Sequence, residues 1–165
     1  VMKMDISSYS LEDLLLAAIK SEVDARAIYN QLADKVNNAF LSDKLRFIAD
    51  EEKKHREFLE SVYKMNMQKE PVLPEISPVP LPEINIGSSM TPPSEVVFQS
   101  MKGEEAASDF YRSLSERFED DETKKMLIYL SEMEIGHFKL LELEKVKLDR
   151  EEEYEIQWDM MHVGP

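Results

Sequence analysis

The stretch IADEEKKHREFLE at residues 48–60 has a counterpart 82 positions later, LSEMEIGHFKLLE at residues 130–142. The correspondence extends without a gap over residues 11–60 and 93–142. The paired positions are Glu22 with Glu104, Ala25 with Ala107, Tyr29 with Tyr111, Leu32 with Leu114, Leu45 with Leu127, Glu52 with Glu134, His55 with His137 and Leu59 with Leu141. The chain therefore contains an internal repeat, and a register kept over so many positions needs a geometric cause.

Each copy is predicted to form two uninterrupted helices. Seven of the eight prolines lie between the copies or at the start of the second, and the eighth is Pro165. Proline inside a helix would remove a hydrogen bond and clash with the preceding turn. Apolar residues recur at steps of three and four, as on the buried face of a bundle helix. Short polar turns at 37–38 and 119–121 make the two helices of each copy antiparallel neighbours.

We expect one all-α domain, an antiparallel four-helix bundle. A chain of 165 residues is the size of a single domain and can bury a core without disulfides. Ser10 is expected to cap the first helix, and Thr91 followed by Pro92 to start the third. The predicted divisions of the domain 1–165 are a helix pair at 11–68, a crossover at 69–92, a helix pair at 93–148 and a C-terminal tail at 149–165.

The long proline-rich crossover between the second and third helices should run extended, at about 3 Å per residue. It can therefore span a helix of about 27 residues, which is about 40 Å long. Its apolar residues indicate that it packs along the bundle, and a flexible linker between two units is the alternative. These residues are Val72, Leu73, Ile76, Val79, Leu81, Ile84 and Ile86.

The composition excludes several classes of function. The net charge of −14 opposes binding to nucleic acid, and reflects either a solvated acidic surface or carboxylates balanced by bound cations. There is no cysteine, which excludes thiol nucleophiles and thiolate metal sites in this sequence and is compatible with a reducing cytosol. The longest apolar run, 14–19, is too short to span a membrane. We expect a soluble cytoplasmic protein with neither nucleic-acid nor membrane partners.

Six polar residues occupy positions near the middle of the four helices where leucine or alanine would be expected. Burying several carboxylates together would cost as much as the whole net stability of a domain unless a positive charge lies among them. No lysine or arginine occupies the same buried positions, so metal ions are the simplest partner. A polar core without metal is the alternative. The predicted ligands are Glu22, Glu52, His55, Glu104, Glu134 and His137.

Glutamate and histidine three residues apart project from one helix face, so each Glu-x-x-His pair can hold one ion. Glu22 and Glu104 can complete or bridge the two ions. Carboxylate and imidazole without thiolate suit iron or manganese in a two-ion site, with zinc less favoured. Tyr29 and Tyr111 lie two turns beyond these glutamates, where they either pack in the core or hold a ligand carboxylate by a hydrogen bond.

Other acidic and histidine residues are predicted to lie outside the site. Glu51, Glu105 and Glu132 neighbour ligand positions but fall off the buried face, so we expect them in solvent. His162 lies outside both copies, and packing or a subunit contact is a better explanation for it than metal binding.

The two Glu and Glu-x-x-His half-motifs resemble those of the rubrerythrin branch of the ferritin-like superfamily. The resemblance covers both helix pairs and implies a ferritin-like bundle, a non-haem di-iron site and a homodimer. Rubrerythrins reduce hydrogen peroxide with electrons from a small donor, and relatives oxidise or store iron. By this likeness Glu22 and Glu104 are bridging or chelating carboxylates, and each Glu-x-x-His pair contributes to the two irons.

The chain departs from that family in two respects. It lacks the four cysteines of a rubredoxin module, so electrons must come from a separate donor such as rubredoxin. Rubrerythrins also usually have an extra ligand glutamate one turn from the third-helix ligand. If that turn is the preceding one, the position in this chain is Met101, and its counterpart in the repeat is Ile19. The resemblance thus implies an oxidoreductase acting on hydrogen peroxide or dioxygen. The alternatives are an iron-oxidising or iron-handling protein and a helical module with a structural dimetal site.

Overall fold

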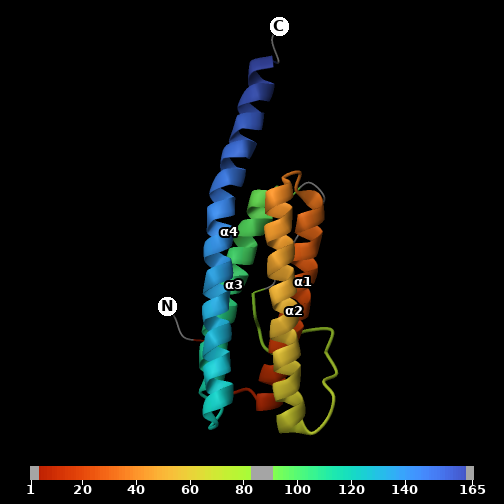
Figure 1. The fold of residues 1–165 in the computed structure, drawn as a ribbon, viewed down its shortest axis with the longest axis vertical. Coiled ribbons are helices and arrows are strands. Elements are labelled where there is room, and N and C mark those ends of the chain that lie inside the picture. The colour runs from red at the N-terminus through yellow and green to blue at the C-terminus, as the bar shows by residue number, and fades with distance from the viewer. Residues whose placement is uncertain (1–3, 83–90, 163–165) are drawn as a thin grey trace.

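Four helices make up the part of the chain that the structure describes, residues 4–82 and 91–162 of a computed structural model. They are α1 (Leu11–Lys35), α2 (Ala39–Met67), α3 (Pro93–Ser115) and α4 (Asp121–His162), as shown in Figure 1. No strand occurs in these two ranges. The prediction of an all-α four-helix bundle is confirmed.

Side-chain caps mark the starts of α1 and α2. The Ser10 hydroxyl accepts a hydrogen bond from the Asp13 backbone N–H at 3.1 Å, as predicted for the start of α1. The Asn38 side chain accepts one from the Leu41 N–H at the start of α2, also at 3.1 Å. Each cap satisfies an N–H group that the first helical turn leaves without a partner.

Helix α3 begins at Pro93, where the second predicted helix pair starts, but its cap differs from the prediction. Pro92 lies outside the helix with an extended backbone, ψ 142°, and Pro93 is the first helical residue. A residue that precedes a proline is disfavoured in the helical region, because the proline ring clashes with its backbone. Pro92 precedes Pro93, so the helix starts only at the second proline and Thr91 is not its cap.

The helices form two hairpins that pack side by side. Helix α1 packs mainly against α2, and α3 mainly against α4, each pair being antiparallel. Helices α2 and α3 run in the same direction, so the chain between them starts at one end of the bundle and enters α3 at the other (Figure 1). The repeat in the sequence is thus a repeated hairpin.

Only part of the proline-rich crossover packs as its apolar pattern predicts. Val79 is buried in the apolar cluster at one end of the bundle, and Leu81 is partly buried against the same cluster. The prediction is wrong for Val72 and Ile76, which are 81% and 80% exposed. They lie in the first part of the crossover, before the chain meets the bundle at Val79. The predicted contacts of Ile84 and Ile86 fall outside the described residues.

Helix α4 is much longer than the other three. Residues 149–162, expected to be a tail, continue the helix to His162. No proline lies between residues 121 and 162, and the stretch is rich in glutamate, a good helix former. Its last turns project beyond the other helices and are exposed (Figure 1).

Two apolar clusters fill the bundle, one toward each end. The first includes Leu15, Leu59, Phe110 and Leu127. The second includes Leu32, Leu45, Val97 and Leu141. Along each helix the predicted metal ligands fall between the residues of these two clusters. The core is therefore interrupted by a polar layer, closed by apolar packing on both sides.

Candidate metal centre

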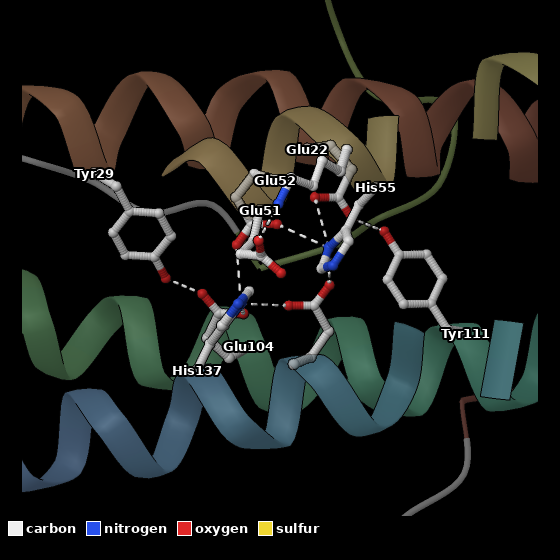
Figure 2. Close-up of polar contacts among 10 residues, drawn as sticks. Glu22, Tyr29, Glu51, Glu52, His55, Glu104, Tyr111 and His137 are labelled. Atoms are coloured by element: carbon white, nitrogen blue, oxygen red, sulfur yellow. Dashed lines mark hydrogen bonds and ion pairs between the residues drawn. The ribbon is translucent and has the colours of Figure 1, made fainter. Parts of the chain in front are cut away.

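The structure brings all six predicted ligands together in this polar layer. Their side chains point into the bundle from all four helices (Figure 2), and each residue is only 1–4% exposed. The ligand-type atoms form two overlapping groups of four, within which all lie within 4.8 Å of one another. One group is Glu22, Glu52, His55 and Glu134, and the other is Glu52, Glu104, Glu134 and His137.

The His55 imidazole faces three carboxylates. Its Nδ1 lies 3.0 Å from Glu134 Oε1, 3.2 Å from Glu52 Oε2 and 3.7 Å from Glu22 Oε2. These glutamates come from α4, α2 and α1, so three helices converge on one nitrogen. This is the first of two half-sites, and Nδ1 is the nitrogen that faces its centre.

The His137 imidazole repeats this arrangement in the second half-site. Its Nδ1 lies 3.1 Å from both Glu52 Oε1 and Glu134 Oε2, and 3.6 Å from Glu104 Oε2. The two imidazole rings stack with centroids 5.7 Å apart. The two copies of the sequence repeat therefore contribute two half-sites that are related by an approximate two-fold axis.

The two kinds of glutamate have different positions in the cluster. Glu52 and Glu134 each direct one oxygen to His55 and the other to His137. Glu22 and Glu104 each belong to one half-site only. The structure thus differs from the expectation of one Glu-x-x-His pair per ion, because the antiparallel α2 and α4 place their glutamates between the two histidines. The shared positions belong to Glu52 and Glu134.

Several atoms of the cluster have no hydrogen-bond partner among the described residues. They are Glu52 Oε1, Glu134 Oε1, both ring nitrogens of His55 and Nε2 of His137. Buried polar groups are nearly always paired, since an unpaired one costs about 1–3 kcal/mol. The close contacts of His55 Nδ1 lack hydrogen-bond geometry, as expected for groups that converge on a common centre. Carboxylate oxygens and imidazole nitrogens without sulfur fit iron or manganese.

The electrostatics of the cluster show how it holds protons when no metal neutralises it. Burial and repulsion from Glu52 raise the pKa of Glu22 to about 8. Burial and the charges of Glu52 and Glu134 raise the pKa of Glu104 well above its ordinary value. Glu22 and Glu104 therefore tend to be protonated, which reduces the number of negative charges in the layer.

The histidines carry the compensating positive charge. Burial opposes ionisation of His137, but its contacts with Glu104, Glu134 and Glu52 raise its pKa to about 12. The pKa of His55 is raised for the same reason. Burial likewise opposes ionisation of Glu52 and Glu134, yet their contacts within the cluster lower the pKa of both. These protons occupy the layer where metal ions would bind, and metal binding would release them.

Two buried tyrosines hold the outer glutamates by hydrogen bonds that cross between the repeat copies. The Tyr29 hydroxyl donates to Glu104 Oε1, and the Tyr111 hydroxyl donates to Glu22 Oε1, on opposite sides of the cluster (Figure 2). Burial and nearby carboxylates raise the pKa of both phenols. Both tyrosines therefore remain protonated donors. Each one packs in the core and also holds a ligand carboxylate by a hydrogen bond, so both expected roles are present.

The remaining sequence candidates lie outside the cluster. Glu105 and Glu132 are exposed. The Glu51 carboxylate pairs with Lys54 at 2.6 Å and belongs to neither group of ligand atoms. His162 is exposed near the end of α4, where its ring stacks on Trp158 with centroids 4.0 Å apart.

Sequence reasoning did not find the pocket that leads to the cluster. It lies between α1 and α3 and reaches Glu22 and Glu104. The available signal was a series of small residues beside these two glutamates, such as Ser21 and Ala25 on α1 and Gly103 on α3. Small residues at such positions are compatible either with close helix packing or with a pocket. The distance between α1 and α3 decides between the two, and the sequence does not give that distance.

No helix among the described residues is both long and apolar enough to cross a membrane. A search of curated proteins finds no match. A solved structure, described as a hypothetical protein from Pyrococcus furiosus, is similar with 34% sequence identity and a TM-score of 0.75. The match covers 88% of this chain and 94% of that one. The family model for rubrerythrin matches residues 13–145, and with the buried Glu and His cluster on four helices this places the chain in the rubrerythrin family.

Proposed function

We propose that this protein is a di-iron oxidoreductase that reduces hydrogen peroxide to water with electrons from a separate donor protein such as rubredoxin. The observation that carries the proposal is the two-fold cluster of four glutamates and two histidines, buried inside the bundle. Membership of the rubrerythrin family supports it. The ligand set also accepts manganese, whereas zinc, which does not change its oxidation state, is less suited to this chemistry.

The chain's own residues would divide the work. Glu52 and Glu134 would be shared between the two ions, while Glu22 with His55 and Glu104 with His137 would complete one half-site each. When bound, a pair of iron ions supplies the electrons that cleave the O–O bond. The tyrosines would fix the outer carboxylates, and the two apolar clusters would exclude water from the layer at its two faces along the bundle. Such preorganisation keeps the ligand geometry through the reaction.

A second candidate function is iron oxidation or iron handling without sustained turnover. It is favoured by Met101, which packs in an apolar cluster one turn before Glu104, the position of the additional rubrerythrin glutamate if that residue precedes the third-helix ligand. A site with six protein ligands resembles ferroxidase centres more than the seven-ligand site does. This second function would use the same metal and the same ligands. It is therefore distinguished from peroxide reduction only by kinetics, that is, by a single oxidation of the iron in place of repeated turnover.

The decisive experiment combines metal analysis with peroxide consumption in the presence of reduced rubredoxin. We expect two iron ions per chain and sustained consumption of peroxide. Loss of a residue that only hydrogen-bonds to a metal ligand typically lowers metal affinity by about 10- to 100-fold. Glu134→Ala removes a ligand, so we expect it to lower iron affinity by more than this and to abolish activity. Glu132→Ala changes an exposed carboxylate on the same helix and is the matched control, with iron content and activity unchanged.

The other outcomes identify the alternatives. A single oxidation of the iron without further consumption of reduced rubredoxin would favour iron handling. A stable metal content with no response to peroxide or dioxygen would indicate a structural site. Equal behaviour of Glu132→Ala and Glu134→Ala would show that the cluster is not the metal site.

A further inference from the structure

A pocket of about 770 Å³ opens between α1 and α3 and reaches the candidate metal centre. Four of the six predicted ligands contribute to its lining: Glu22, Glu52, Glu104 and Glu134. One water molecule occupies about 30 Å³ in the liquid, and hydrogen peroxide has only two heavy atoms. The volume falls instead in the range of about 300–1,000 Å³ typical of sites for organic ligands. The pocket is far larger than the smallest peroxide requires.

Small side chains create this space. The facing walls include Ala18, Ser21 and Ala25 on α1 and Gly103, Ala106 and Ala107 on α3. Helices α1 and α3 pack less closely against each other than against their hairpin partners. Because these side chains are small, the space between the two helices is open above the carboxylates, as far as the described residues show.

The crossover supplies a further apolar wall. Val79, which is buried, and Leu81, which is partly buried, line the pocket and also pack against the apolar cluster at that end of the bundle. The prolines at 78, 80 and 82 line it as well. A ligand in this space would therefore contact mainly alkyl groups, with polar groups concentrated where the carboxylates lie.

The charges around the pocket select against anions. Its outer residues include Lys20, which pairs with Asp24 at 3.0 Å, and the exposed Glu75. The only cation on this rim among the described lining residues is thus already matched by a carboxylate. A carboxylate or phosphate ligand would therefore meet the carboxylates of Asp24 and Glu75 at the rim and no unmatched lysine or arginine among the described lining residues, whereas an uncharged ligand requires no cation.

We infer that this pocket binds the hydrocarbon group of an uncharged organic hydroperoxide and directs its O–O bond to the metal centre. The inference rests on the proposed function and names its substrate class. The reaction is ROOH + 2 H⁺ + 2 e⁻ → ROH + H₂O. The O–O bond breaks, one O–H bond forms on each oxygen, and the two electrons come one at a time from the separate donor protein.

The first test compares three peroxides with the iron-loaded full chain and reduced rubredoxin. We expect kcat/KM for cumene hydroperoxide to be at least as large as that for hydrogen peroxide, with tert-butyl hydroperoxide between them. Ala106→Phe places a ring in the pocket and should lower kcat/KM for cumene hydroperoxide at least tenfold more than for hydrogen peroxide. Ala39→Phe, at an exposed position at the start of α2, is the matched control and should leave both values unchanged.

The second test measures binding without metal or turnover. The alcohol product of cumene hydroperoxide, 2-phenyl-2-propanol, should bind the metal-free chain in saturation-transfer NMR, and Ala106→Phe should weaken its binding at least tenfold while Ala39→Phe should not. Absence of reduction with all three peroxides would overturn the proposed function. Equal losses for the large and small peroxides, or alcohol binding that Ala106→Phe leaves intact, would overturn the pocket assignment even if hydrogen peroxide is reduced.

Discussion

At the scale of single residues, the two tyrosines connect the halves of the site most directly. Tyr111, on α3, donates its hydroxyl hydrogen to Glu22 on α1, and Tyr29, on α1, donates to Glu104 on α3. Each repeat copy therefore orients a carboxylate that belongs to the other copy. Groups that hold metal ligands in this way typically contribute a factor of about 10–100 to metal affinity.

We predict that Tyr111→Phe weakens iron binding by about 10- to 100-fold while the fold is retained, because Glu22 loses the donor that fixes it. Competition with a chelator measures the affinity. Tyr63→Phe is the control, since Tyr63 is equally buried but donates to Glu12, away from the cluster, at 2.8 Å. Similar affinities for the two variants would contradict a role of Tyr111 in the site.

The residues of the site were readable in the sequence because they break an apolar pattern. A glutamate or histidine at a position where the helix should be apolar is visible without a structure, as Glu52 and His55 show. The sequence did not show which glutamates are shared between the two half-sites and which belong to one of them. Whether a glutamate lies between the histidines or beside one of them depends on how α2 and α4 are rotated, and sequence spacing does not record that rotation.

At the scale of the elements, the crossover is the segment whose local sequence says least about its packing. Its prolines predict an extended chain, and its apolar residues look alike. Yet Val79 is buried whereas Val72 is 81% exposed. The difference arises from where the path of the chain meets the bundle, which is a tertiary property.

We predict that Val79→Ala lowers the free energy of unfolding by about 1.5–2.5 kcal/mol, because it removes two buried methyl groups worth about 0.8 kcal/mol each and leaves a cavity. Val72→Ala should change it by less than about 0.5 kcal/mol, as is usual for exposed positions. Urea unfolding followed by circular dichroism measures both. Equal, small effects of the two substitutions would indicate that the crossover is a free linker.

Helix boundaries were predictable where a cap or a proline marks them. Ser10 marks the start of α1, and the paired prolines locate the start of α3 to within one residue. The far end of α4 was not marked, because its sequence continues with good helix formers beyond the last core contact. The buried residues of α4 end at Leu148, but backbone propensity extends the helix beyond them.

At the scale of the whole molecule, the polar layer couples folding to pH. Without metal, the pKa of Glu22 is raised to about 8 from an ordinary value of 4.5, and that of His137 to about 12 from 6.5. In both cases the folded chain binds protons that the unfolded chain releases. Stability therefore falls as the pH rises, between 4.5 and about 8 for Glu22 and from 6.5 upward for His137.

We predict that the metal-free chain becomes steadily less stable from pH 6 to pH 9. Thermal unfolding followed by circular dichroism, after treatment with a chelator, measures the trend. Glu22→Gln should reduce the slope, whereas Glu132→Gln, at an exposed site, should not. Iron loading should reverse the trend over this range, because the metal competes with the same protons. A metal-free stability that rises with pH would contradict this description of the cluster.

The projecting end of α4 determines which spectroscopic signals can follow these changes. Trp158 is the sole tryptophan of the chain, and it is 51% exposed on that projection, stacked against His162. Tryptophan emission consequently reports on the last turns of α4 and not on metal binding or protonation in the polar layer. The tyrosines bonded to Glu22 and Glu104 are the internal chromophores there, so tyrosine absorbance is the optical probe that registers the state of the site.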